Sequence, residues 1–167
     1  VQGRVLSMLS KMIQPKRILE LGTFTGYSAL CLAEGLTEDG ELVTLEHNDE
    51  MEDAIRRNLG LSPLGEKVKL VIGDAKESLQ RLKGEFDLVF IDADKENYIN
   101  YWNLIVPMMN KGGIILSDNV LWSGKVLEEV NLPAESYTLY ASARSAGTKL
   151  PFMGTEYEVK ELTENSF

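Results

Sequence analysis

Two short apolar runs within residues 86–125 constrain the fold of this chain more than any other feature. The runs DLVFI and GIILS are rich in β-branched and aromatic residues, are too short for helices and are flanked by turn residues, so each predicts a buried strand. Between them lies a segment of helical length, residues 95–110, followed by Lys111-Gly112-Gly113. A strand, a helix and a strand of these lengths predict a right-handed crossover unit of a parallel sheet.

Side chains with oxygen donors follow both runs. Asp92 comes directly after the first, and Asp118 and Asn119 end the second. Because parallel strands end at the same edge of a sheet, these residues emerge at the carboxyl edge, where ligands of open α/β sheets bind. Three hard oxygen ligands suit Mg²⁺ or Ca²⁺ far better than zinc. Asp92 and Asp94 could instead cap the helix that begins near Lys95, and Asp118-Asn119 could be a turn pair.

Strand and helix patterns alternate along the rest of the chain. After a helix over residues 1–13, the pattern predicts strands at 17–21, 41–46 and 68–72, and helices at 27–36, 50–59 and 76–82. The order predicts an α/β fold, a doubly wound, Rossmann-like parallel sheet with helices on both faces. Two stretches with period-two alternation, 135–143 and 155–162, predict an antiparallel C-terminal strand pair joined by a 147–154 loop. No linker or repeat interrupts the sequence, so we expect one domain over residues 1–167.

Composition excludes several classes of function. The net charge of −9 leaves no basic stripe for a nucleic-acid backbone, so no nucleic-acid partner is expected. Cys31 and His47 are the only residues of their kinds, which excludes a disulfide framework, a thiolate zinc site and a His-rich metal site. The sequence contains no apolar run of about 18 residues and no signal peptide, so a cytoplasmic protein without a membrane partner is expected.

A glycine-bearing turn follows the first predicted strand, RILEL. The segment Gly22-Thr23-Phe24-Thr25-Gly26 leads into a helix, which is the opening of a nucleotide-binding α/β fold, and its two glycines allow a ligand to approach the backbone closely. The spacing is Gly-x-x-x-Gly, whereas NAD sites typically have Gly-x-Gly-x-x-Gly. Glu46 ends the second strand 20 residues after Gly26, where an acid can accept hydrogen bonds from ribose hydroxyls.

Acids and amides along this predicted edge favour an adenosine that carries a positive sulfonium over an NAD pyrophosphate. The expected cofactor-binding residues are Glu20, Gly22, Thr23, Gly26, Tyr27, Ser28, Glu46, His47, Asp74, Ala75 and Asp92. Glu20 and Glu46 could also be surface acids at strand ends, and His47 could touch adenine or be a plain exposed histidine.

The segments ILELGTFTGYSALCLAEGL, VTLEHN, GDA, FDLVFIDADKENY and GGIILSDNVLWSGKV resemble the cation-dependent S-adenosylmethionine O-methyltransferases. The resemblance is to the catechol and caffeoyl-CoA type, bacterial branch, and covers residues 1 to about 127. It implies transfer of a methyl group from S-adenosylmethionine to a hydroxyl of a small catechol-like or phenylpropanoid-like acceptor. It also implies Mg²⁺, or another divalent cation such as Ca²⁺ or Mn²⁺, at Asp92, Asp118 and Asn119, with Lys95 as general base.

The same resemblance places Glu46 at the ribose and the segment from Glu20 to Ser28 around the methionine half of the cofactor. Trp122 could form a wall of the acceptor pocket or could simply pack, and Glu156 is a candidate for a glutamate that contacts the acceptor in catechol methyltransferases. The family normally has a further N-terminal segment that helps to build a homodimer, and this chain starts after it. Residues 128–167 lack the family's usual last helix and closing strand.

The expected mechanism follows from the chemistry of the acceptor. A catechol hydroxyl has a pKa well above 7, so it must be ionised in place, and a divalent cation together with Lys95, three residues after Asp92, would do so. Two other classes stay open: an NAD(P)-dependent oxidoreductase and a non-catalytic cofactor-binding module. The absent third glycine and the missing Ser-Tyr-x-x-x-Lys constellation count against the oxidoreductase.

Overall fold

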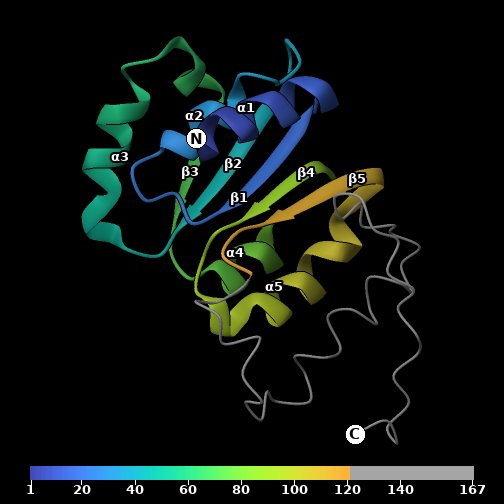
Figure 1. Ribbon diagram of the computed structural model, residues 1–167. Coiled ribbons are helices and arrows are strands. Elements are labelled where there is room, and N and C mark those ends of the chain that lie inside the picture. The colour runs from blue at the N-terminus through green and yellow to red at the C-terminus, as the bar shows by residue number, and fades with distance from the viewer. Residues whose placement is uncertain (121–167) are drawn as a thin grey trace, which may run out of the picture. The chain divides into compact units, whose positions relative to one another are not determined.

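The computed structural model describes residues Val1–Val120, and in them five parallel strands form one sheet in the order β3-β2-β1-β4-β5 (Figure 1). The strands are β1 (Arg17–Leu21), β2 (Glu41–Glu46), β3 (Val68–Ile72), β4 (Phe86–Ile91) and β5 (Met109–Ser117). The direction of winding reverses between β1 and β4, which is the position where open α/β sheets bind ligands at their carboxyl edge. The doubly wound parallel sheet expected from the sequence is confirmed.

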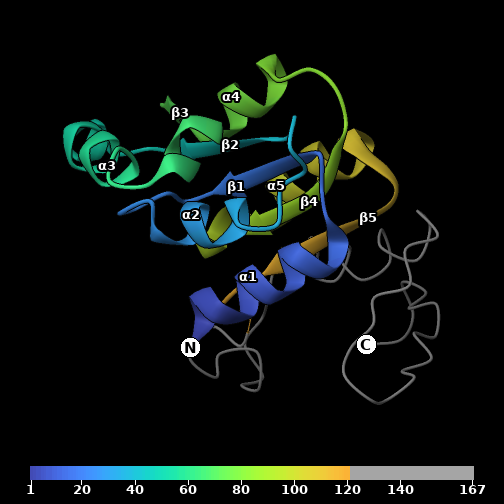
Figure 2. The ribbon, with the colours of Figure 1, turned by 90° about the horizontal axis from the view of Figure 1, so that it is seen from above.

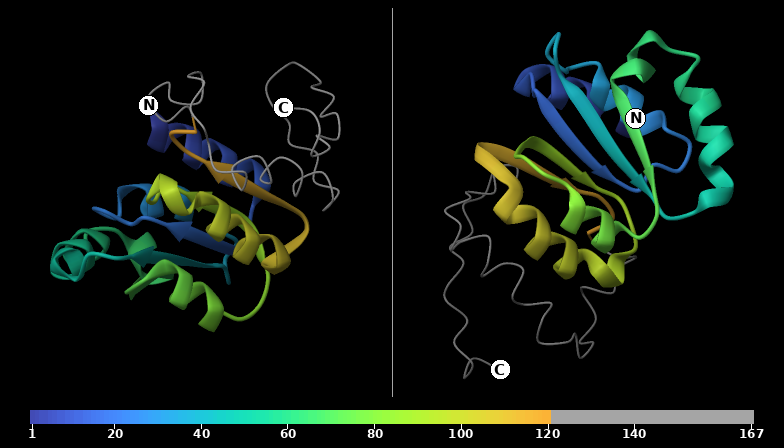
Figure 3. Two further views of the ribbon diagram at one scale, coloured as in Figure 1. Left: turned by 90° about the horizontal axis from the view of Figure 1, so that it is seen from below. Right: turned by 180° about the vertical axis from the view of Figure 1, so that it is seen from behind.

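Helices cover both faces of the sheet (Figures 2 and 3). They are α1 (Gln2–Ile13), α2 (Tyr27–Ala33), α3 (Glu52–Leu59), α4 (Ala75–Arg81) and α5 (Tyr98–Ile105), with 3₁₀ turns η1 (Asp49–Met51), η2 (Pro63–Lys67), η3 (Lys95–Asn97) and η4 (Val106–Met108). On one face, α1 and α2 bury Leu6 and Leu32 against the sheet, and on the other face α4 and α5 bury Leu79 and Ile105. Alternate residues of β1 and β2 enter the two clusters, as the period of a strand requires, and β4 does the same from Leu88 onward, after a register shift.

The largest differences from the expected boundaries are at the ends of two helices, α5 and α2, while α3 and α4 differ from the expected bounds by one or two residues. The predicted helix over 95–110 ends as α5 at Ile105, because Pro107 has no N–H with which to continue the helical hydrogen bonds. Strand β5 consequently starts at Met109, and the residues expected as a turn, 111–113, belong to it. Helix α2 ends at Ala33, three residues early, beside Gly35, whose Cβ position lies 2.1 Å from the Ser10 carbonyl carbon of α1. The predicted C-terminal strand pair lies outside the described residues.

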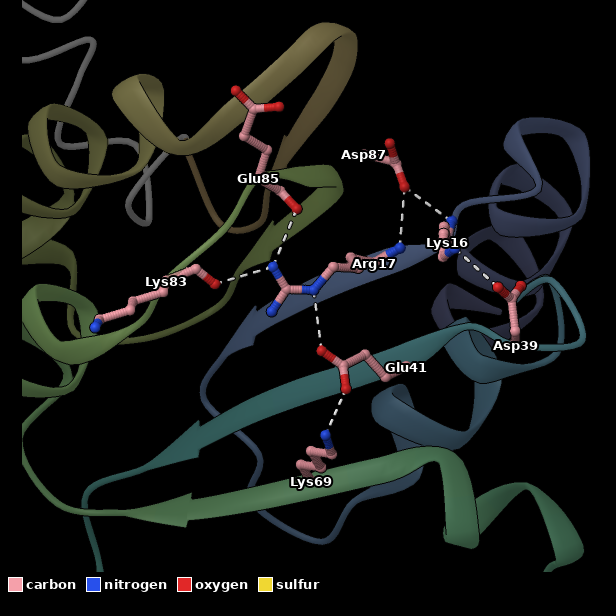
Figure 4. Close-up of polar contacts among 8 residues, drawn as sticks. All are labelled: Lys16, Arg17, Asp39, Glu41, Lys69, Lys83, Glu85 and Asp87. Atoms are coloured by element: carbon pink, nitrogen blue, oxygen red, sulfur yellow. Dashed lines mark hydrogen bonds and ion pairs between the residues drawn. The ribbon is translucent and has the colours of Figure 1, made fainter.

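Arg17 ties the amino ends of the strands together, at the opposite edge from the expected site (Figure 4). Its Nε donates to Glu41 Oε1 at 2.9 Å, its Nη1 to the carbonyl of Lys83 at 3.0 Å, and its guanidinium lies 4.6 Å from the centre of the Phe86 ring. Lys69 Nζ lies 2.5 Å from the other oxygen of Glu41, so one carboxylate joins β1, β2 and β3. Within the described residues, no helix is long and apolar enough to span a bilayer.

Candidate functional site: a cavity at the carboxyl edge of the sheet

A cavity of about 870 Å³ opens at the carboxyl edge of the sheet, between the loop after β1, the ends of β2 and β4, and the start of α1. Nine of the eleven expected cofactor residues line it, namely Gly22, Thr23, Tyr27, Ser28, Glu46, His47, Asp74, Ala75 and Asp92. The other two do not line it: Glu20 is fully buried in β1, two residues before Gly22, and Gly26 forms the N-cap of α2 between the lining residues Thr25 and Tyr27. The sheet topology therefore brings most of the expected cofactor-binding residues to one cavity.

The loop after β1 has a backbone that strongly restricts its sequence. Gly22 has a φ of 95°, and a Cβ built on it would lie 2.2 Å from the carbonyl oxygen of Asp92, so only glycine fits where the β1 and β4 loops meet. Phe24 has a φ of 51° although it carries a large side chain, which is 72% exposed. Its N–H donates to Glu46 Oε2 at 2.8 Å, and this bond holds the unusual conformation in place.

Two acids expected to bind the cofactor also hold the backbone around the cavity. Glu46 accepts from the N–H of Phe24 through Oε2 and from the N–H of Asn48 through Oε1, at 2.8 and 2.9 Å. Asp74 caps α4 by accepting from the N–H groups of the next turn, which holds the pKa of its carboxyl below the usual value. Because an ionised carboxylate has about four acceptor positions, both acids keep capacity for a ligand.

Among residues 1–120, Glu20 is the one buried acid. Its Oε2 accepts from Thr44 Oγ1 at 2.6 Å, while Oε1 has no hydrogen-bond partner among the described residues. Burial raises the pKa of Glu20 to about 7; the hydroxyls of Ser28 and Thr44 oppose the rise, and the charges of Asp92 and Glu46 add to it. The alternative that Glu20 is a surface acid is therefore wrong.

The expected metal ligands lie together at the ends of β4 and β5. The side-chain Nδ2 of Asn119 donates to Asp92 Oδ1 at 3.3 Å, and Asp118 Oδ1 accepts from the backbone N–H of Asn119 at 2.7 Å. The side-chain amide of Gln2, at the start of α1, donates to Asp118 Oδ2. No three His, Cys, Asp or Glu side chains form a metal cluster within residues 1–120; the set at this position comprises two carboxylates and one amide. These are hard oxygen donors of the kind that Mg²⁺ takes.

Lys95 lies beside this set, on the first turn after β4. Its Nζ donates to Asp92 Oδ1 at 3.2 Å, to the carbonyl of Ala93 at 3.1 Å and to Tyr98 Oη at 2.7 Å. Burial lowers the pKa of Lys95, but the contacts with Tyr98 and Asp92 outweigh it and raise the pKa above its ordinary value. The amine is consequently charged at neutral pH in this arrangement.

Tyr98 is a site residue that sequence reasoning missed. Its hydroxyl lies 3.2 Å from the carbonyl oxygen of Ile91 and 3.0 Å from that of Asp118, so it links Lys95 to the ends of β4 and β5. Burial raises the pKa of this hydroxyl, which therefore stays neutral and can donate. The sequence signal that could have found Tyr98 is its position three residues after Lys95, because this spacing brings two side chains together on a helical turn.

The helix-capping interpretation of the acids after β4 does not hold. Asp94 occupies the N-cap of η3, but its carboxylate accepts from Tyr101 Oη and from the Asn97 side chain and makes no side-chain cap bond to the backbone. His47 is exposed at the mouth of the cavity. Trp122 and Glu156, the expected acceptor residues, lie outside the described part of the chain.

A parallel α/β sheet with a glycine loop and acids at its switch point defines the class of nucleotide-binding α/β domains. Comparison with known families is more specific, because the O-methyltransferase family model matches residues 1–144. The chain belongs to the O-methyltransferase family.

Curated proteins with similar sequences carry more specific names. The chain is 40% identical over 129 residues to the catechol O-methyltransferase of Mycobacterium tuberculosis, covering 77% of this chain and 59% of that protein. It is 34% identical over 145 residues to caffeoyl-CoA O-methyltransferase 2 of Petunia hybrida, covering 83% and 60%. The chain thus spans about 60% of the length of these curated relatives.

Solved structures agree with the sequence comparisons. The O-methyltransferase from Bacillus cereus in complex with SAH has a TM-score of 0.78 at 34% identity, covering 86% of this chain and 69% of that one. The O-methyltransferase TomG from Streptomyces achromogenes, in complex with SAM, has a TM-score of 0.74 at 30% identity, covering 86% and 66%. The fold and the family therefore rest on independent findings.

Proposed function

We propose that this chain transfers the methyl group of S-adenosylmethionine to a hydroxyl of a small catechol-like or phenylpropanoid-like acceptor, in a reaction that depends on Mg²⁺. The observation that carries the proposal is the meeting of Asp92 and Asn119 at 3.3 Å, with Asp118 next in sequence, beside the cavity at the switch point. Relatives that act on catechol and on caffeoyl-CoA support the acceptor class. A homodimer remains a prediction.

Each group has a proposed place. The cofactor would lie in the cavity between the Gly22 loop and Glu46, and the divalent cation would be held by Asp92, Asp118 and Asn119. When bound, S-adenosylmethionine supplies an electrophilic methyl group, and the cation supplies positive charge that lowers the pKa of the acceptor hydroxyl. The donor set fits such an ion, because it offers carboxylate and amide oxygens and no soft ligand.

The residues of this chain orient the acceptor and receive its proton. Lys95 Nζ, within 3.2 Å of Asp92 Oδ1, is the basic group placed to accept the proton of an acceptor hydroxyl. Tyr98 and Asp92 keep the pKa of this amine high; a divalent cation held beside it would lower that pKa, so that the lysine would release its proton to solvent before it takes the proton of the acceptor. Tyr98 holds the lysine at the ends of β4 and β5, so the base stays close to the carboxylates of Asp92 and Asp118.

The test is a methyl-transfer assay with labelled S-adenosylmethionine on a panel of catechols and caffeoyl thioesters. We expect methylation of at least one diol, loss of the activity in EDTA, and its return on addition of Mg²⁺. Methylation unaffected by EDTA would remove the cation from the proposal. Cofactor binding without transfer to any acceptor of the panel would favour the non-catalytic cofactor-binding module.

A further inference from the structure

Three consecutive residues of β2 hold three consecutive residues of the glycine loop. The N–H of Gly22 donates to the carbonyl of Leu45 at 3.0 Å, which simply extends the pairing of β1 with β2. The next two contacts come from side chains: Thr44 Oγ1 lies 2.6 Å from Thr23 Oγ1, and Glu46 accepts from the N–H of Phe24. The loop's shape therefore depends on β2 side chains as well as on its glycines.

Thr44 sits at the centre of a buried chain of hydrogen bonds. It is 0% exposed, and it lies between Thr23, which is 1% exposed and lines the cavity, and the fully buried Glu20. Both of its contacts, to Thr23 Oγ1 and to Glu20 Oε2, measure 2.6 Å. A hydroxyl has one hydrogen to donate, so the direction of each bond in the chain is constrained.

That constraint decides the direction of the hydrogen bond between Thr23 and Thr44. With Glu20 ionised, its carboxylate only accepts, so Thr44 donates to Glu20 and must accept from Thr23. The hydrogen of Thr23 is then used inside the protein, in the bond that ties the glycine loop to β2.

We propose that Thr44 is a positioning residue for the cofactor: its hydroxyl couples the buried carboxylate of Glu20 to Thr23 and so holds the glycine loop in the shape that lines the cavity. This inference rests on the proposed function, because it assigns the cavity to S-adenosylmethionine. Thr44 lies in the interior of β2 and makes its contacts through Thr23 and Glu20, so its effect on the ligand is indirect.

The charges around Glu20 make pH a second readout. The acidic groups that influence it are Asp92 at the end of β4 and Glu46 at the end of β2, and the Cys31 thiol of α2 also faces it. Removing the Thr44 donor takes away a hydrogen bond to the ionised carboxylate, which shifts the titration of Glu20 to higher pH. A residue that only filled space would leave that titration unmoved.

The test is calorimetric titration of S-adenosylhomocysteine into the whole chain between pH 6 and pH 9. Thr44→Val retains the shape of the side chain and removes its hydroxyl; we expect about tenfold weaker binding at pH 8 and a midpoint of the pH dependence moved upward. Thr44→Ser retains the hydroxyl and should bind within about twofold of wild type. Thr37→Val, which removes a hydroxyl that bonds Asp39 and does not line the cavity, is the matched control.

The outcomes separate two failures. A wild-type chain that does not bind S-adenosylhomocysteine would overturn the proposed function and this inference with it. A wild-type chain that binds, with Thr44→Val equal to wild type or Thr44→Ser as weak as Thr44→Val, would overturn the role of Thr44 alone. If Thr44→Val does not fold, Thr23→Val removes the same hydrogen bond from the loop side, and unchanged binding of that variant would be equally contradictory.

Discussion

Replacing Glu20 by glutamine should change how the stability of the protein depends on pH. Burial raises the pKa of this carboxyl from 4.5 to about 7, so the folded state prefers it protonated. A group with a raised folded pKa contributes stability that is fully present below its unfolded pKa and is lost as pH rises through the folded pKa. At about 1.4 kcal/mol for each pKa unit, the free energy of unfolding should fall by about 3 kcal/mol between pH 4.5 and pH 8.

The Glu20→Gln variant removes this titration and keeps an acceptor for the Thr44 hydroxyl. The assay is urea unfolding of both proteins at half-unit steps from pH 4.5 to pH 8, followed by the fluorescence of the buried Trp102. Subtracting one curve from the other cancels the groups that the two proteins share. The exposed Glu38→Gln variant serves as control and should track wild type throughout.

The reasoning predicts that wild type loses stability relative to Glu20→Gln by about 1.4 kcal/mol for each pH unit across the centre of this window. Parallel curves for the two proteins would refute it, because they would mean that Glu20 titrates alike in the folded and unfolded chains. A wild-type protein that gained stability relative to the variant with rising pH would mean that ionised Glu20 is favoured by folding.

Three further predictions follow from the same geometry. Lys95→Ala should lower turnover by roughly 10²-fold while the dissociation constant of S-adenosylhomocysteine stays within about twofold; Lys111→Ala is the control, and an unchanged rate would remove Lys95 from the mechanism. Asp118→Ala should abolish calorimetric Mg²⁺ binding, so binding that survives intact would exclude this residue from the ligand set. Arg17→Ala should lower the free energy of unfolding by about 2 kcal/mol, since it removes the partly buried pair with Glu41 and two backbone contacts. Glu41 is held by Lys69 and Arg17, which keep the pKa of its carboxyl below the ordinary value. The stability that the Arg17–Glu41 pair contributes is therefore present above the unfolded pKa of Glu41 and is lost as pH falls through the folded pKa. An equal loss of stability in Arg17→Ala at pH 7 and at pH 3 would contradict this prediction.

The strands were predictable because their signals are local. Arg17–Leu21, Glu41–Glu46 and Val68–Ile72 match their predicted bounds, since each is a short apolar run between turn residues. The end of α5 was less predictable, because Pro107 stops the helix within an apolar run that has no other break. The glycines of 111–113 suggested a turn, whereas the edge strand β5 accommodates them through a shift in its register with β4.

The site was predictable as a set of strand ends and not as a set of contacts. Parallel topology alone brings Asp92, Asp118 and Asn119 to one edge, and the structure places them there. Thr44 could not be recognised, because a threonine inside the run ELVTLE looks like an ordinary strand residue. Its role depends on the register that sets it opposite Glu20, and that register is a property of the folded sheet.

The most direct test of the account is to titrate S-adenosylhomocysteine and NAD⁺ separately into the wild-type chain by calorimetry. Saturable binding of one S-adenosylhomocysteine per chain, with no heat of binding for NAD⁺, is the expected result. Binding of NAD⁺ in preference to S-adenosylhomocysteine would contradict the assignment of the cavity and favour a hydride-transfer enzyme in its place.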